Sequence, residues 1–110
     1  MTQVPPATGA AGSAPPIEKL MTLSQSEYSK SIGAFAGEAA AATALRGDPV
    51  TLDLGGGQVV ITFKKVQGFS FGGLVEMPRA RIVINMNGVE PAEASAFMRR
   101  FDISFQRGGG

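Results

Sequence analysis

Residues 50–66 are VTLDLGGGQVVITFKKV, and this stretch decides the fold class of the chain. Val50, Leu52 and Leu54 alternate with polar residues, which is the two-residue period of a strand with one buried face. The glycines at 55–57 allow a tight reversal, and the β-branched run after them favours a second strand. The stretch therefore predicts a β-hairpin in the middle of the chain.

A further β segment follows this hairpin. Residues 80–86, ARIVINM, have a continuous apolar centre and end at the turn dipeptide Asn87–Gly88, so we expect another strand there. The segment 67–78 interleaves glycines with apolar residues, which is compatible with a bulged strand and with a long hairpin loop. The number of strands is therefore three or four.

Upstream of the hairpin the pattern is helical. Ser24 followed by Glu27 matches a capping box, so the first helix is predicted to begin at Gln25. Apolar residues then recur at spacings of three and four until the sequence Arg-Gly-Asp-Pro at 46–49 ends the helix. Residues 17–21 are compatible with a short docked segment, because their apolar side chains are spaced for one helical face.

The C-terminal part is predicted to be a second helix. Pro91 is suited to the first helical position, and Glu90 and Glu93 suit the start of a helix. Apolar residues fit helical spacing from Pro91 to about Gln106. Residues 101–106 also alternate as a strand does, so both conformations stay open for that stretch.

These elements predict an α+β fold: a small antiparallel sheet of three or four strands with an N-terminal and a C-terminal helix, in the order α-β-β-β(-β)-α. Residues 1–16, rich in Pro, Ala and Gly, are expected to be a disordered tail. Residues 17–107 are expected to form one domain, and residues 108–110 a flexible end.

The composition argues against most catalytic centres. The 110 residues contain no Cys and no His, so the usual zinc, copper and iron ligands and the common nucleophile–base pairs are missing. The nine acidic residues are scattered, without calcium-loop spacing. We therefore expect no metal site, no cofactor and no enzymatic activity; the residual enzymatic hypothesis is acid–base chemistry by Asp53 and Glu76.

Charge and hydropathy bear on location. The formal net charge is +1, which gives no strong field toward a polyanion. The most apolar stretch, 31–45, is shorter than the roughly 20 residues that a membrane span needs. The first residues lack the basic and apolar regions of a secretory signal, so a cytoplasmic protein without a membrane span is expected.

Two candidate surfaces emerge from the sequence. Basic residues of the predicted sheet, together with aromatic residues of the glycine-rich segment, suggest a surface for nucleic acid, since cations bind phosphates and rings stack on bases. These residues are Lys64, Lys65, Phe69, Phe71, Arg79 and Arg81. The competing interpretation is that the aromatic rings pack in the core or at a sheet edge.

The second surface lies on the first helix. Small residues recur every fourth position at Ser29, Gly33, Gly37 and Ala41, which leaves one side of the helix smooth and open to close packing. The partner is the protein's own sheet or a second copy of the chain. The preferred hypothesis is accordingly a non-enzymatic interaction or structural module that self-associates through this face or a sheet edge, or binds another protein. The alternative is nucleic-acid binding.

Overall fold

The computed structural model describes residues 15–73 and 75–109, except for the side chains of Phe69, Phe71, Val75 and residues 106–109. The elements in chain order are β2 (Ile17–Met21), α1 (Gln25–Ala36), α2 (Glu38–Leu45), β3 (Val50–Leu54), β4 (Gly57–Phe71), β5 (Val75–Asn87) and α3 (Pro91–Gly109). Most of the predicted tail, residues 1–14, and the last residue of the predicted flexible end, Gly110, lie outside the described residues.

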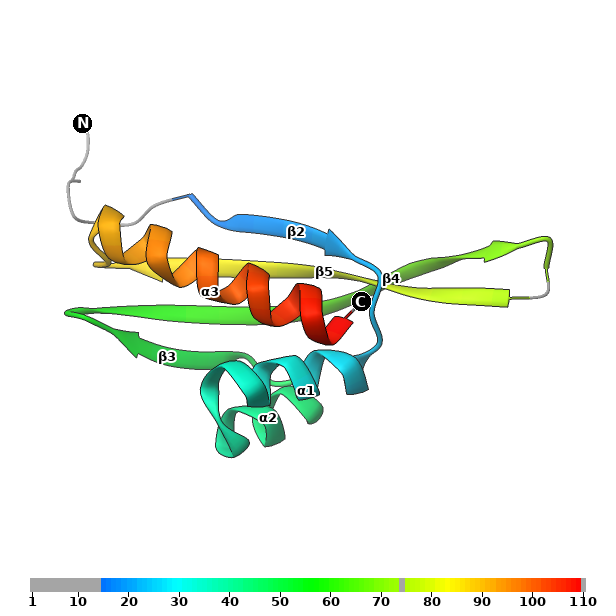
Figure 1. Ribbon diagram of the computed structural model, residues 1–110, viewed down its shortest axis with the longest axis horizontal. Helices are drawn as coiled ribbons and strands as arrows, with labels where there is room; N and C mark the ends of the chain where they lie inside the picture. Colours follow the sequence, from blue (N-terminus) through cyan, green and yellow to red (C-terminus); the bar gives the residue numbers. More distant parts are fainter. Residues whose placement is uncertain (1–14, 74, 110) are drawn as a thin grey trace.

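The four described strands form one antiparallel sheet in the order β2-β5-β4-β3. The register aligns Ile17, Ile84, Ile61 and Val50 in one row across the sheet. The helices α1 and α3 lie on the same side of this sheet (Figure 1). The predicted α+β class with an antiparallel sheet is therefore confirmed, but the predicted element order is wrong in two places.

The first correction concerns residues 17–21, which form the edge strand β2 and pair with β5. Ile17, Lys19 and Met21 point toward the helices, so a two-residue period and a helical period both fit this short segment. Residues 17–21 form a strand because they pair with the edge of β5. Lys19 also forms an ion pair with Asp102 of α3, with 3.0 Å between Nζ and Oδ1.

The second correction concerns the first helix, which is two helices joined at Gly37. Gly37 has φ 100° and ψ 171°, a backbone conformation that is unfavourable for residues with a Cβ atom. The chain reverses there, and α2 packs beside α1 (Figure 1). The predicted start is confirmed, because Ser24 and Glu27 form the capping box with α1 beginning at Gln25.

The C-terminal helix α3 runs from Pro91 to Gly109 and includes residues 101–106, so the extended alternative for that stretch is wrong. Helical spacing aims Phe97, Phe101 and Phe105 at the core, where each is almost fully buried. Phe101 and Phe105 stack with 4.1 Å between ring centroids. The aromatic ladder of α3 therefore supplies much of the core on the helical side.

Tyr28 of α1 lies at the centre of this core and has no exposed surface. Its ring centroid lies 4.8 Å from that of Phe63 on β4 and 6.0 Å from that of Phe105 on α3. Tyr28 thus joins both helices to the sheet. Its hydroxyl has no hydrogen-bond partner among the described residues.

The predicted hairpin at 50–66 is confirmed, with Leu54 paired to Gly57 across a turn at Gly55 and Gly56. The undecided segment 67–78 continues β4 and β5 beyond the sheet, with a register shift between Val66 and Phe69. Gly68 lies in that bulge, where a Cβ atom would collide with the Met77 carbonyl oxygen. The segment therefore combines both alternatives, because a bulged strand end leads through a turn that includes Gly72 and Gly73 into the start of β5.

Beyond Lys65 and Ala80, β4 and β5 pair with each other alone among the described strands. We call this extension the ribbon, defined as residues 67–71 and 75–78. Figure 1 shows it projecting past the helices and past β2 and β3. It contributes to the elongated shape of the molecule, which measures 53 × 31 × 23 Å.

Candidate interaction surface

The sheet has one face packed against helices and an opposite face that no described helix covers. We call the second the open face. Because side chains alternate along each strand, the register assigns its residues. They are Glu18 and Leu20 of β2, Thr51 and Asp53 of β3, Gln58, Val60, Thr62, Lys64 and Val66 of β4, and Arg79, Arg81, Val83, Asn85 and Asn87 of β5.

The centre of the open face is apolar or β-branched rather than charged. Thr62 of β4 lies opposite Val83 of β5, and Val60 is the next outward residue of β4. These three side chains are partly exposed, and Leu20 on the neighbouring β2 is 53% exposed. An apolar centre surrounded by polar residues is the usual composition of a protein interface.

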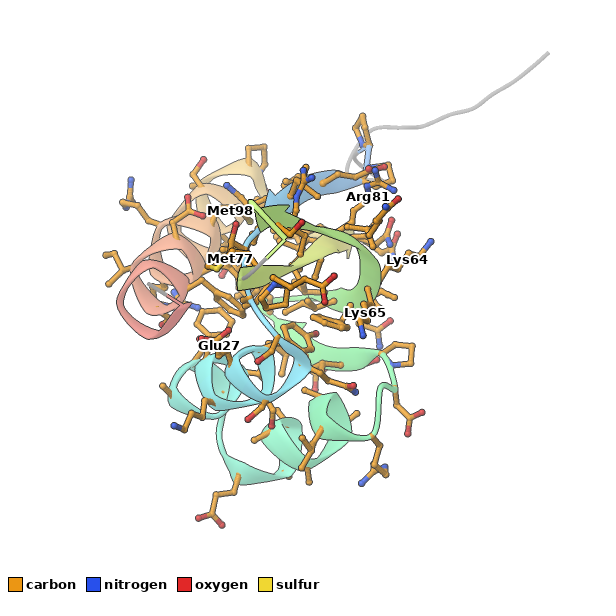
Figure 2. All side chains as sticks on the ribbon, turned by 90° about the vertical axis from the view of Figure 1, so that its right-hand side faces the viewer. Glu27, Lys64, Lys65, Met77, Arg81 and Met98 are labelled. Atoms are coloured by element: carbon orange, nitrogen blue, oxygen red, sulfur yellow. The ribbon has the colours of Figure 1, made fainter. Side chains whose placement is uncertain are left out.

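The rim of the open face carries charges of both signs. Lys64 lies directly opposite Arg81, and Arg79 lies two residues further along β5. Arg81 forms an ion pair with Glu18, with 3.4 Å between Nε and Oε1. Figure 2 shows Lys64 and Arg81 on the side of the sheet away from α3. Asp53 lies at the far end, paired with Gln58.

The structure divides the predicted nucleic-acid residues. Lys64, Arg79 and Arg81 share the open face, whereas Lys65 pairs with Ala80 and belongs to the helix-packed face. Phe69 and Phe71 lie in the ribbon at register positions opposite Met77 and Val75, and their side chains are outside the described residues. The four cations therefore do not form one surface.

The small residues predicted as a self-association face contact each other within the chain. The Ser29 hydroxyl donates a 2.8 Å hydrogen bond to the Ala41 carbonyl oxygen, and Ser29 is buried. A Cβ atom at Gly33 would lie 3.1 Å from the Cβ of Ala41. Gly37 forms the link between the helices. The close packing that this spacing predicted is therefore realised between α1 and α2.

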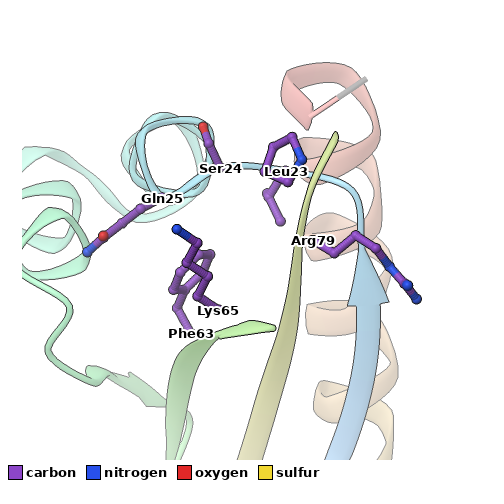
Figure 3. Close-up of a pocket in the computed structure, with 7 residues that line it drawn as sticks. Leu23, Ser24, Gln25, Phe63, Lys65 and Arg79 are labelled. Atoms are coloured by element: carbon purple, nitrogen blue, oxygen red, sulfur yellow. The ribbon is translucent and has the colours of Figure 1, made fainter. Parts of the chain in front are cut away.

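Two hollows lie where the ribbon leaves the sheet. A cavity of about 120 Å³ is lined by Leu23, Ser24, Gln25, Phe63, Lys65, Pro78 and Arg79 (Figure 3). An adjoining depression of about 310 Å³ is lined by residues 65–68 and 76–78. Lys65 and Pro78 belong to both. In Figure 3 the Arg79 side chain points away from Ser24 and Gln25, whereas the Lys65 side chain points toward them.

The described residues offer little support for the enzymatic hypothesis. Asp53 pairs with Gln58 at one end of β4, and Glu76 pairs with Ser70 in the ribbon at the other, so these carboxylates do not meet. Within residues 15–73 and 75–109, no group of three acidic side chains is placed to hold a metal ion. Burial raises the pKa of the Tyr28 hydroxyl well above its ordinary value.

Sequence reasoning missed the centre of the open face. The signal was present in the alternation of β4, whose outward positions include Val60, Thr62 and Val66 where solvent-facing strands usually carry polar residues.

No family model, curated protein or solved structure matches the chain. Among the helices described, none combines the length and apolar character that crossing a membrane requires.

Proposed function

We propose that the protein is a non-enzymatic interaction module that self-associates through the open face of its sheet. The observation that carries this proposal is the apolar centre formed by Val60, Thr62 and Val83, together with Leu20, which lies opposite Arg81 on the edge strand and is more than half exposed. The described helices cover one face of the sheet only, so the open face with its apolar centre is accessible to a further layer. A second copy of the chain supplies the other layer.

Self-association through the sheet edges is less well supported than through the open face. The outer edges of the four-stranded part belong to β2 and β3, and each strand has five residues. Short edge strands are a common protection against edge pairing. In the longer ribbon, Pro78 of β5 has no backbone N–H to donate to an added strand. Contact through the face therefore remains the better route.

Nucleic-acid binding is the alternative function, and one observation favours it. Lys64 lies opposite Arg81, with Arg79 close by on the same face, so three cations face one side. Two features weaken it: Glu18 already forms an ion pair with Arg81, and Lys65 lies on the other face. A phosphate-binding surface would bind strongly at low salt and weakly at high salt.

The two functions are separated by measuring the solution mass of the full chain with size exclusion and light scattering. The protein is run alone and with a mixed-sequence single-stranded oligonucleotide, at about 50 mM and about 200 mM salt. We expect a mass of twice the chain mass at both salt concentrations, unchanged by the oligonucleotide.

A monomer that stays monomeric up to high micromolar concentration would overturn the self-association proposal. A monomer that moves onto the oligonucleotide at low salt and leaves it at high salt would establish the alternative instead. In that case substitution of Lys64 by Gln should lower the oligonucleotide affinity, because a phosphate contact is lost.

A further inference from the structure

We infer that two copies of the chain pack open face to open face with their strands running in opposite directions, so that Asp53 of each copy lies against Lys64 of the other. This inference rests on the proposed function and deepens it, because it states how the second copy is oriented on the open face.

Charges of opposite sign lie at opposite ends of the open face. Lys64, Arg79 and Arg81 lie at the end next to the ribbon. Asp53 lies at the other end, beside the turn between β3 and β4. Glu18 lies between the two ends and forms an ion pair with Arg81 of its own chain. The open face is therefore cationic at one end and acidic at the other.

Asp53 and Lys64 have no ion-pair partner within their own chain. Asp53 pairs with Gln58, which lies six residues along β4 from Lys64, so about 20 Å separates the two charged residues at roughly 3.4 Å per residue. Both side chains are exposed, and neither forms an ion pair with another of the described residues. Each is therefore available to an opposite charge on a second copy.

The charges select one of two symmetric arrangements. Stacked sheets keep their strands within about 30° of each other, so a two-fold axis between two open faces runs either along the strands or across them. An axis along the strands places Lys64 and Arg81 of one copy on the same two residues of the other. An axis across the strands reverses one copy, so that each cationic end faces an acidic end. Like charges across an interface disfavour the first arrangement and leave the second.

The apolar centre and the charges specify the same position for this axis. The row midway between Gln58, the partner of Asp53, and Lys64 is the row of Ile61. The apolar centre surrounds that row, because Val60 precedes Ile61 and Thr62 follows it. An axis across the strands at Ile61 therefore places Val60 of each copy over Thr62 of the other.

The spacing of stacked sheets allows the ion pair to form. Sheets stack about 10 Å apart, and neighbouring strands lie about 4.8 Å apart, so the Cα atoms of Asp53 and of Lys64 in the second copy are separated by roughly 11 Å. Both side chains point into the space between the sheets, and together they are long enough to span that distance. Symmetry produces the pair twice, and the assembly closes as a dimer.

Charge reversal tests this orientation. Asp53→Lys and Lys64→Glu are made alone and together, and sedimentation equilibrium measures the dissociation constant of each dimer. We expect either single variant to raise the dissociation constant about fivefold, and the double variant to return it close to the wild-type value. Residues about 20 Å apart in one chain do not couple directly, so such recovery arises across the interface.

A matched control separates this contact from a change in net charge. Asp53→Lys is combined with Arg99→Glu, at an exposed position of α3 on the helical side of the sheet. This variant has the same net charge as the variant that combines Asp53→Lys with Lys64→Glu. We expect its dissociation constant to stay as high as that of Asp53→Lys alone.

Carbodiimide cross-linking of the wild-type chain provides a second test that needs no substitution. The reagent joins a carboxylate directly to an amine as an amide, and mass spectrometry of proteolytic fragments identifies the linked residues. We expect a link between Asp53 and Lys64 in the covalent dimer. A covalent dimer in which Lys64 is linked only to other carboxylates would overturn the orientation.

The remaining outcomes distinguish failure of the orientation from failure of the proposed function. Additive weakening in the double variant would show that Asp53 and Lys64 do not meet. A tighter dimer for Lys64→Glu alone would indicate an axis along the strands. Both results overturn the orientation and leave self-association intact. A monomeric wild-type chain, in contrast, would overturn the proposed function itself.

Discussion

Thr62 of β4 lies opposite Val83 of β5 at the centre of a sheet face that no described helix covers. The valine of this pair departs from the usual pattern of a sheet that meets water, in which polar side chains point outward and alternate with buried ones. The relationship supports the proposal that a second copy of the chain binds at this face.

Gly33→Leu should lower the free energy of unfolding by about 1–3 kcal/mol, because the added side chain has no room between the helices. A Cβ atom alone at Gly33 already lies 3.1 Å from the Cβ of Ala41. Urea unfolding at fixed protein concentration measures the change. Ala34→Leu, at an exposed position of the same helix, is the control and should change stability by less than about 0.5 kcal/mol.

Gly37→Ala should lower the free energy of unfolding by about 1–3 kcal/mol through backbone strain. Gly37 has φ 100°, and a Cβ atom there would meet no atom within 4 Å, so a steric clash contributes nothing. Gly56→Ala is the control, since its φ is not positive and its Cβ also has open space. Equal losses in both variants would contradict the assignment to backbone strain.

Tyr28→Phe should raise the free energy of unfolding by about 1 kcal/mol, because the buried hydroxyl is desolvated without a described partner. The ring contacts with Phe63 and Phe105 are kept in this variant. Thermal and urea unfolding both measure the change. A loss of stability would show that the hydroxyl is hydrogen-bonded in solution.

Tyr28 is the single tyrosine of the chain, so its ionisation can be followed by ultraviolet absorbance. Burial raises its pKa in the folded state above the value near 10 of an unfolded chain. The folded protein therefore holds its phenolic proton where the unfolded chain releases it, and stability falls as the pH rises above about 10. The tyrosinate signal should appear together with the loss of circular dichroism. A reversible transition near pH 10 in the folded protein would contradict the buried position.

Local signals in the sequence predicted the helices whose first residues are typical of a helix start. Ser24 and Glu27 fixed the start of α1, and Pro91 fixed the start of α3. The break at Gly37 escaped prediction because a glycine inside a helix costs only about 1 kcal/mol relative to alanine, so the alanine-rich pattern continues through it. The reversal of the chain at Gly37 is stabilised by packing of α2 on α1, and such tertiary packing cannot be recognised from the local pattern.

Which residues share the candidate surface follows from the strand register more than from the local sequence pattern. Adjacent residues of a strand point to opposite faces, so Lys64 and Lys65 were separable from the sequence once both were assigned to one strand. The β3–β4 hairpin was predictable, but the position of β2 was not, because β2 pairs with β5, which is far away in sequence. That pairing places Leu20 opposite Arg81 and Glu18 opposite Val83, and it brings Glu18 into an ion pair with Arg81.

The most direct test of self-association through the open face is sedimentation equilibrium of the wild-type chain beside Val83→Lys and Ala39→Lys. Val83 is partly exposed in the single chain, so a lysine there disturbs folding little, but it places a charge in the centre of the interface. We expect a dimer for wild type and for Ala39→Lys, and a dissociation constant raised by about tenfold or more for Val83→Lys. Equal dissociation constants for Val83→Lys and wild type, or a monomeric wild-type chain, would contradict self-association through this face.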